Sequence, residues 1–394
     1  MTRTKIVILS IGILLLAGFG WAPLVLNPRI TWTSGDSECP NIACDSSDNL
    51  HVVWSDFTPG NYEIYYKKST DGGTTWSANR RLTWTSGSSW TPAIAVNGDK
   101  NVYVVWYEDM PGNSEIYFKK STDGGANWTT NMRLTYNTGW SYGPDIAVDS
   151  LGRLHVVWFD STTGDHEIYY KKSSNGGTNW TASRQLTNNA GLSYCPRIAA
   201  FSTNSLHLVW SDSTPGVTEI YYKKSSDGGA NWSTSKRLTW TSGDSVNPDI
   251  AVDSSGNPHV AWRDNTPGNE EIYYKRSADK GTSWSSDKRL TWNSGTSRNP
   301  SIAIGLPDEI HVVWDDDTPG NYEIYYKGSF DGGANWSASF RETWNSGAST
   351  SPSIVFNSQG ILHVAWYDYT PGNYEIYHVA WLIVVPMLSS FGVK

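Results

Sequence analysis

Short runs of β-branched and aromatic residues alternate along the chain with clusters of Gly, Pro, Asn and Asp. Runs such as Glu63–Lys68 and His155–Trp158 are bounded by turn-forming residues on both sides, which is typical of strands joined by turns. No segment repeats its apolar positions with the period of a helix. The hydrophobic pattern therefore predicts an all-β protein.

The same four phrases recur in a fixed order. We expect Pro-x-Ile-Ala-Val, as in Pro144–Val148, to form an inner strand, and His155–Trp158 to form the second. The third strand is then Glu-Ile-Tyr-Tyr, as in Glu63–Lys68, and the outer strand is Arg-Leu-Thr-Trp, as in Arg81–Trp84. A repeat of this length, in which each unit contacts the next, is typical of a propeller blade. The segments start every 52 residues, at Arg29, Arg81, Arg133, Gln185, Arg237, Arg289 and Arg341.

The two ends of the repeat region determine the number of blades. Residues Arg29–Trp32 form an outer-strand phrase with no preceding blade, and Pro352–Tyr377 supply three strands with no outer strand after them. Joining these ends completes a blade and removes the exposed edges that promote aggregation. We therefore predict a seven-bladed β-propeller of four-stranded antiparallel blades over residues 28–378, in which the N-terminal strand closes the last blade.

A glycine-rich turn with the pattern Ser-x-Asp/Asn-x-Gly-x-x-Trp recurs six times at the same period. This pattern resembles the Asp box of the bacterial-neuraminidase-repeat, or sialidase-like, families. The Asp or Asn side chain can accept bonds from its own turn and the glycine can adopt a positive φ, so we interpret the boxes as structural. The resemblance also implies that they lie away from the active site. Their residues include Ser69, Asp71, Gly73, Trp76, Asp123, Trp128, Asn175, Trp180, Asp227, Trp232, Asp279, Trp284, Asp331 and Trp336.

The positions at which the copies differ indicate where a ligand would bind. One variable column precedes the inner strand, a second lies in it, and a third follows the core tryptophan. All three are predicted to surround one mouth of the central channel, opposite the Asp boxes. Aromatic, acidic and guanidinium groups suit sugars, so the candidate ligand-binding residues are Arg197, Arg263, Arg298, Tyr142, Tyr194, Asp145, Asp249 and Trp90. The columns are Glu38, Trp90, Tyr142, Tyr194, Val246, Arg298, Thr350; Asn41, Ala93, Asp145, Arg197, Asp249, Ser301, Ser353; and Ser55, Tyr107, Phe159, Ser211, Arg263, Asp315, Tyr367.

A catalytic function has less support. The sialidase resemblance implies an arginine triad, and Arg197, Arg263 and Arg298 fall on three consecutive predicted blades. It also implies a tyrosine nucleophile with a partnering Glu, an Asp acid and an Arg-Ile-Pro motif. Thr31 stands where that proline is required, and no catalytic residue can be assigned. We predict a non-catalytic propeller that binds a glycan or a surface protein; the alternatives are a sialidase-like exo-glycosidase for an acidic sugar and a tethered adhesion spacer.

Two columns are acidic in every copy and are interpreted as structural. We expect the column that contains Glu63 to pair with the nearby lysines and the column that contains Asp56 to cap the following turn. No metal or other cofactor is predicted, because the chain has neither a Cys/His constellation nor a phosphate-binding glycine loop.

The N-terminal residues 1–26 lie outside the repeat and resemble an export signal. Arg3 and Lys5 precede an uncharged run from Ile6 to Leu26, which fits either a cleaved signal peptide or a retained signal anchor in the membrane. We therefore expect an extracellular or cell-surface monomer. A net charge of −8 with no basic face argues against nucleic-acid binding.

The apolar C-terminal tail, residues 379–394, replaces the seventh Asp box. It fits an extra strand, a terminus without function or a membrane contact. The chain has three cysteines, so at least one thiol is unpaired within it, and no disulfide framework is predicted.

Overall fold

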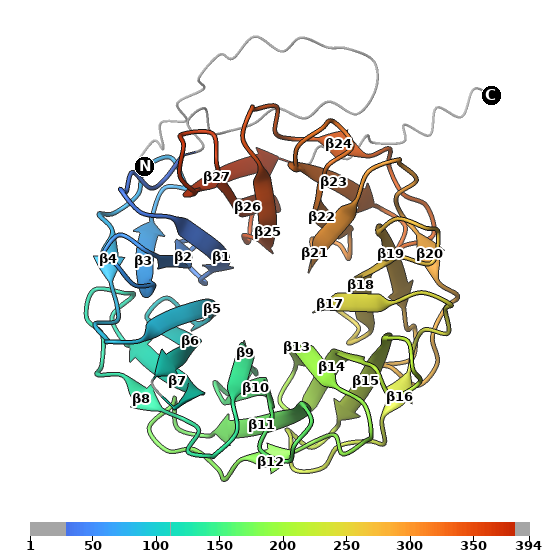
Figure 1. Cartoon of the computed structure of the whole chain (residues 1–394), viewed down its shortest axis with the longest axis horizontal. Helices are drawn as coiled ribbons and strands as arrows, with labels where there is room; N and C mark the ends of the chain where they lie inside the picture. The colour runs from blue at the N-terminus through green and yellow to red at the C-terminus, as the bar shows by residue number, and fades with distance from the viewer. Residues whose placement is uncertain (1–28, 111, 383–394) are drawn as a thin grey trace, which may run out of the picture.

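The computed structural model describes residues 29–110 and 112–382, which form seven antiparallel sheets arranged as a ring (Figure 1). The predicted strand order is confirmed, since the strands of a blade are hydrogen-bonded in sequence order from the channel outward. The inner strands are β1 (Ser37–Cys44), β5 (Ser88–Asn97), β9 (Ser141–Val148), β13 (Ser193–Phe201), β17 (Ser245–Val252), β21 (Ser297–Ile304) and β25 (Ser349–Phe356). The second strands are β2 (Leu50–Asp56), β6 (Asn101–Met110), β10 (Leu154–Asp160), β14 (Ser205–Asp212), β18 (Pro258–Asp264), β22 (Ile310–Asp316) and β26 (Ile361–Asp368).

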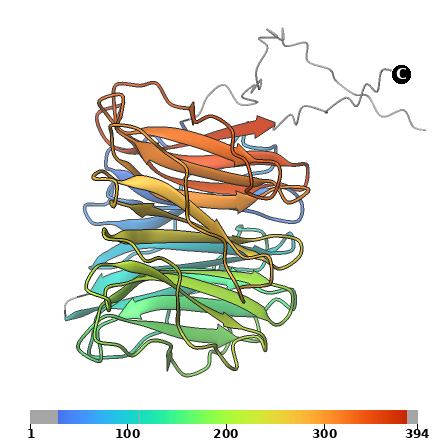
Figure 2. The same cartoon turned by 90° about the vertical axis from the view of Figure 1, so that its right-hand side faces the viewer.

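The outer half of each blade combines a third strand of six to nine residues with a short outer strand. The third strands are β3 (Glu63–Ser69), β7 (Asn113–Ser121), β11 (Glu167–Ser173), β15 (Glu219–Ser225), β19 (Glu271–Arg276), β23 (Glu323–Ser329) and β27 (Glu375–Leu382). The outer strands have two residues each: β4 (Arg80–Arg81), β8 (Met132–Arg133), β12 (Arg184–Gln185), β16 (Lys236–Arg237), β20 (Lys288–Arg289) and β24 (Phe340–Arg341). Seen from the side, the strands run through the thickness of the ring (Figure 2). The turns between them therefore lie on two opposite faces.

The hydrophobic core lies between the blades. Each second strand contributes a tryptophan that is at most 2% exposed, and each core cluster combines residues of two neighbouring blades, the last and the first included. Because a blade buries its faces only against its neighbours, the ring must close to complete the core. The buried tryptophans are Trp54, Trp106, Trp158, Trp210, Trp262, Trp314 and Trp366.

The chain ends close the ring as predicted. Arg29 pairs with Tyr377 of β27 as an antiparallel bridge, and the Ile30 amide donates to the Ile376 carbonyl at 2.8 Å. The guanidinium of Arg29 also binds the Glu375 carboxylate at 2.7 Å. The N-terminal segment is therefore the fourth strand of blade seven.

Each Asp box joins its blade to the preceding one. In the first box the Asp71 carboxylate accepts the Thr75 amide at 2.9 Å, and the Ser69 hydroxyl accepts the Gly73 amide at 2.8 Å. Gly73 has a φ of 88°, and a Cβ there would lie 2.1 Å from the His378 ring of blade seven. Trp76 packs edge-on against that same ring. Equivalent contacts join Trp128 to Tyr66, Trp180 to Phe118, Trp232 to Tyr170, Trp284 to Tyr222 and Trp336 to Tyr274.

Blade seven lacks a box but retains the aromatic contact. Trp381 of β27 packs edge-on against Tyr326 of blade six, with ring centroids 5.6 Å apart. It thus makes the contact that an Asp-box tryptophan makes in the other blades. Beside it Glu342 stands where the other outer strands have leucine or isoleucine, and burial raises its pKa to about 7 despite a hydrogen bond to Trp381. The strand thus continues four residues into the segment 379–394, whose remainder lies outside the described residues.

The two constant acidic columns have different roles. Asp56 caps its turn as predicted, since its carboxylate accepts the Thr58 amide at 2.9 Å. The predicted pairing of Glu63 with lysine is wrong. Glu63 binds the Arg81 guanidinium at 2.8 Å, because Arg81 lies on the adjacent outer strand, while Lys67 extends across the blade junction and donates to the Ile30 carbonyl.

Candidate functional site

The variable positions meet in pairs at the channel mouth opposite the Asp boxes. The columns before the inner strand and after the core tryptophan, which the sequence presents as separate, are cross-strand neighbours in every blade. Each pair therefore forms one variable unit of the surface. The pairs are Glu38–Ser55, Trp90–Tyr107, Tyr142–Phe159, Tyr194–Ser211, Val246–Arg263, Arg298–Asp315 and Thr350–Tyr367.

A backbone bulge follows each of these pairs and was not predicted. One extra residue interrupts the register of the inner strand, for example between Glu38 and Asn41, and a residue with φ between 44° and 54° precedes a proline. A left-handed conformation costs roughly 1–3 kcal/mol for a residue other than glycine. The repeated proline marks the position but does not indicate this conformation, because the residue before a proline is usually extended. The bulge residues are Cys39, Thr91, Gly143, Cys195, Asn247, Asn299 and Ser351.

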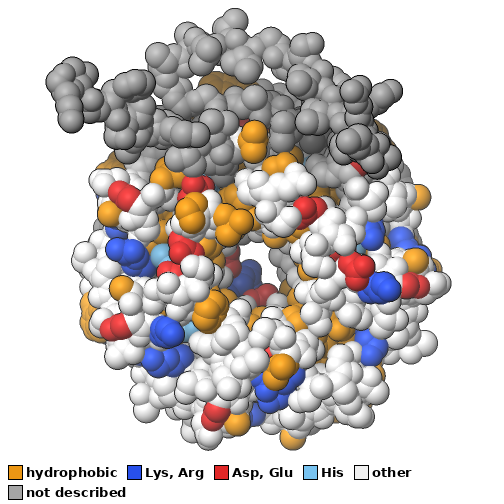
Figure 3. All heavy atoms as spheres, turned by 180° about the vertical axis from the view of Figure 1, so that it is seen from behind, with side chains coloured by type: hydrophobic (Ala, Val, Ile, Leu, Met, Phe, Trp, Pro, Cys, Tyr) orange, Lys and Arg blue, Asp and Glu red, His pale blue; other side chains and the backbone are white. Residues whose placement is uncertain are grey.

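The channel inside this mouth is a cavity of about 840 Å³ lined by the inner strands of all seven blades. Acidic and basic side chains lie side by side in its depth (Figure 3). They belong to the second variable column, whose members also link the blades. The Asp145 carboxylate accepts the amide of Ile198 in the next blade at 2.8 Å, and Asn41 accepts that of Ile94 at 2.9 Å.

Three of the predicted residues come together in this channel. Arg197 lies between Asp145 and Asp249 of the two flanking blades, with its Nε 4.0 Å from the Asp249 carboxylate. Burial raises the pKa of Asp145 to about 6, against the opposing effects of Arg197 and the Ile198 amide. Burial also raises the pKa of Asp249, and the two carboxylates raise that of Arg197 although desolvation opposes them. The trio carries one net negative charge when fully ionised, so it does not favour an anion.

The other two arginines do not join this trio. Arg263 forms a salt bridge with Glu270 of its own blade. Arg298 binds the Asp315 carboxylate at 3.1 Å and lies over the Tyr322 ring, 3.6 Å from its centroid. Each of the three arginines therefore has its own carboxylate, and only Arg197 of the three lines the channel cavity.

Two of the predicted aromatic residues, Trp90 and Tyr142, lie in two ring clusters on blades one to three, which the cross-strand pair Trp90–Tyr107 brings side by side. Trp90 packs on Tyr62 with centroids 3.6 Å apart, and Tyr142 packs at 5.0 Å from Tyr107 and 5.8 Å from Phe159. We call these five residues the aromatic arc. Since Tyr107, Tyr142 and Phe159 also line the channel, the arc borders its mouth.

Tyr194, on blade four, lies beyond the end of the arc. Its hydroxyl is 3.3 Å from that of Thr218, and it makes no ring contact among the described residues that places it in the arc. Tyr194 therefore continues the variable surface as a polar side chain.

A further variable column contacts these residues and was missed. It precedes the constant Glu of each third strand. All of its side chains except Ser114, which donates to Asp109, contact the cross-strand pairs of their own or the next blade. The signal was available, because these positions differ between copies as much as the assigned columns do. The residues are Tyr62, Ser114, His166, Thr218, Glu270, Tyr322 and Tyr374.

One tyrosine of this column is paired with a glutamate. The Tyr62 hydroxyl donates to the Glu38 carboxylate at 3.2 Å. Burial, followed by the charge of Glu38, raises the pKa of Tyr62 well above its usual range. Burial thus favours the protonated phenol, and its bond to Glu38 is the kind of Tyr–Glu pair that the sialidase resemblance implies.

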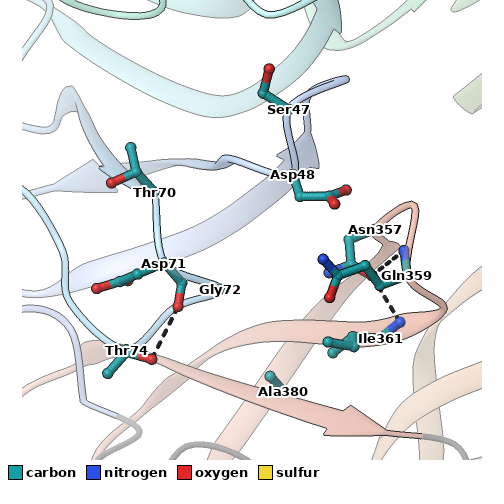
Figure 4. A pocket seen from close by; sticks show the side chains of 10 residues that line it. All are labelled: Ser47, Asp48, Thr70, Asp71, Gly72, Thr74, Asn357, Gln359, Ile361 and Ala380. Atoms are coloured by element: carbon teal, nitrogen blue, oxygen red, sulfur yellow. Dashed lines mark hydrogen bonds between the residues drawn. The ribbon is translucent and has the colours of Figure 1, made fainter. Parts of the chain in front are cut away.

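A second cavity, of about 400 Å³, lies on the Asp-box face at the seam between blades one and seven (Figure 4). Its polar groups are already bonded within the protein. The Asp48 carboxylate accepts the amide and hydroxyl of Ser358, and the Asn357 side chain accepts the amides of Gln359 and Ile361. This cavity therefore offers less to a ligand than the channel mouth.

Two further features bear on metals and membranes. Within residues 29–110 and 112–382, no three His, Cys, Asp or Glu side chains are grouped so that they could hold a metal ion. In the same residues, no helix is long and apolar enough to cross a membrane. The uncharged run from Ile6 to Leu26 lies outside the described residues.

Comparison with known proteins supports the architecture. Residues 144–293 match the profile of a family described as BNR repeat-containing. No curated protein matches the chain. The predicted resemblance to the Asp-box, sialidase-like families is confirmed, as is the seven-bladed fold.

Similar solved structures include enzymes of two kinds and a protein of unknown function. An intramolecular trans-sialidase from Ruminococcus gnavus is 13% identical, with 91% of this chain and 99% of that chain covered and a TM-score of 0.55. A polysaccharide lyase described as an ulvan lyase is 11% identical, with 87% and 94% covered and a TM-score of 0.60. A Dyadobacter fermentans protein of unknown function is 12% identical, with 93% and 100% covered and a TM-score of 0.58. At such identities the likeness concerns the fold alone.

Proposed function

We propose that this protein is an exported, non-catalytic propeller that binds a glycan through its variable channel mouth. The observation that carries the proposal is the aromatic arc, which places contiguous aromatic rings beside polar and charged groups of the channel. Aromatic faces pack against the apolar faces of sugars, while carboxylates and amides bond their hydroxyls. The diversity of the blades is concentrated on this face, as expected where a repeated scaffold presents an asymmetric ligand site.

The pairing of the arginines argues against a sialidase-like exo-glycosidase. A carboxylate of the substrate would have to compete with Asp249, Glu270 and Asp315, each already paired with an arginine. We therefore place the enzymatic function second.

Glycan binding can be tested with purified full-length protein on an array of neutral and acidic glycans. Trp90→Ala and Tyr142→Ala should each reduce binding to the bound glycan. Leu151→Ala is the matched control, because Leu151 is 64% exposed on the Asp-box face. Its binding should equal that of the wild-type protein.

Two results would contradict the proposal. One is an array without any bound glycan when circular dichroism shows folded protein. The other is equal binding by the wild-type protein and both arc variants. Turnover of a fluorogenic sialoside that is lost in Arg197→Ala or Arg298→Ala would instead establish the exo-glycosidase.

A further inference from the structure

Six aromatic side chains are exposed at equivalent positions around the outer edge of the described ring. They lie three residues after the outer-strand arginine, where the chain turns from the edge toward the channel mouth. Their exposed fractions range from 61% to 75%, whereas the core tryptophans are at most 2% exposed. We call them the outer aromatic ring: Trp32, Trp84, Tyr136, Trp240, Trp292 and Trp344.

Each tryptophan is held in place by cations that already have partners. Arg81 lies 5.6 Å from the Trp84 ring centroid, and its guanidinium binds Glu63. Lys119 of the next blade is also 5.6 Å from that centroid, and its ammonium donates to the Leu82 carbonyl. The indole is therefore contacted by two paired cations, while Trp84 remains 66% exposed to solvent.

The ring closes without this aromatic residue at one position. Asn188 stands at the equivalent site between blades three and four, and Gln185 replaces the neighbouring arginine. Nevertheless Leu186 is buried and β12 pairs with β11 as in other blades. Packing at the blade junction therefore does not require an exposed aromatic side chain.

We propose that the outer aromatic ring is a second, multivalent binding surface for a polysaccharide chain. Its members are separate, so they form no contiguous apolar patch of the kind that a protein partner or a lipid surface requires. Isolated aromatic faces instead match the apolar faces of pyranose rings that recur along a polymer. Because the flanking cations are already paired, recognition rests on the aromatic faces, and neutral polysaccharides should bind as well as acidic ones.

Repetition compensates for weak single contacts. When one contact is made, the next occurs at a high effective concentration, so that several weak sites give a strong overall attachment. This surface would hold a polymer independently of the ligand at the channel mouth.

The test is retention of the full-length protein by native gels containing a neutral β-glucan or a uronate-containing polymer. Asparagine, as at position 188, is the replacement. Trp84→Asn should weaken retention roughly threefold, and the triple variant that adds Trp240→Asn and Trp292→Asn should weaken it roughly 30-fold. The double variant Gln185→Arg/Asn188→Trp should strengthen retention. This variant still tests the proposal if the triple variant fails to fold.

Each outcome has a definite meaning. Unchanged retention in a folded triple variant, or no gain in the Gln185→Arg/Asn188→Trp variant, would overturn the proposal. Loss of retention in about 0.5 M salt, roughly three times physiological ionic strength, would do so too, since it indicates binding by charge. Leu151→Ala should leave retention unchanged, because Leu151 belongs to neither the arc nor the outer aromatic ring. The triple variant should keep wild-type binding on the glycan array, so failure of this proposal and failure of the mouth site are distinguishable.

Discussion

The charged trio in the channel makes a quantitative prediction for Asp145→Asn. The pKa of Asp145 rises from 3.8 to about 6 on folding because the carboxyl is buried. Between these values the native state retains a proton that the unfolded chain has lost, so the contribution of Asp145 to stability falls as the pH rises from about 4 to 6. Each pKa unit corresponds to about 1.4 kcal/mol, which places the cost of the charged form near 3 kcal/mol above pH 6.

Asparagine removes this cost and retains the link to the next blade. Asn41, in the same column of blade one, already accepts the amide of Ile94 at 2.9 Å. Asp145→Asn should therefore raise the free energy of unfolding by about 1–3 kcal/mol at pH 7–8, the lower value allowing for the lost attraction to Arg197. At pH 4 the difference should disappear.

The measurement is urea unfolding of both proteins from pH 4 to 8. Burial lowers the pKa of His155 and His207 to about 4, so acid destabilises both proteins and the difference between them isolates Asp145. Asp253→Asn is the control of opposite sign, because hydrogen bonds, chiefly from Asn257, outweigh desolvation and lower the pKa of Asp253. A loss of stability in Asp145→Asn at pH 8, or a difference that persists unchanged at pH 4, would refute the reasoning.

Three further predictions concern the blade contacts. Glu342→Leu should raise the free energy of unfolding at pH 8 by about 2–3 kcal/mol, since its pKa near 7 means that the charged form is disfavoured by burial; the gain should shrink below pH 5 in urea titrations. Trp381→Ala should lower the free energy of unfolding by about 3–5 kcal/mol, whereas Trp344→Ala, at a site 75% exposed, should lower it by about 1 kcal/mol or less. Equal thermal midpoints of the two variants would contradict the contact between Trp381 and Tyr326 of blade six. Gly73→Ala should destabilise far more than Gly72→Ala, because both have positive φ but only at Gly73 would the new Cβ clash with an imidazole of blade seven; equal calorimetric midpoints would argue against this staple.

The sequence was sufficient for the architecture because the repeat reports the same structural constraint many times. The strand order, the blade count and the closure all followed from phrases that recur at one period. The direction of a side chain is a different matter. Position alone placed Arg263 and Arg298 at the mouth but could not show that Glu270 and Asp315 bind them there. These ion pairs depend on the directions of individual side chains at positions that differ between the repeats, so the repeat pattern does not predict them.

The bulges and the last blade show a second limit. The residue before a proline usually adopts an extended conformation. Local propensity would therefore not suggest the left-handed conformation found at Cys39 and Asn247. Similarly, the tail gave no indication that Trp381 would restore the contact of the missing box. In both cases the packing of neighbouring blades determined the local conformation.

The closure of the ring also determines how the molecule responds to force. The N-terminal strand is held to β27 by the Arg29–Tyr377 bridge, the Ile30 amide and the Arg29–Glu375 ion pair, and no Asp box fastens it. A load applied to the N-terminal end therefore acts first on this seam, where the bonds would break one after another. The junctions held by Asp boxes, including the one that joins blade one to blade seven, would bear tension only after this strand had peeled away. We expect the N-terminal strand to detach before any blade unfolds.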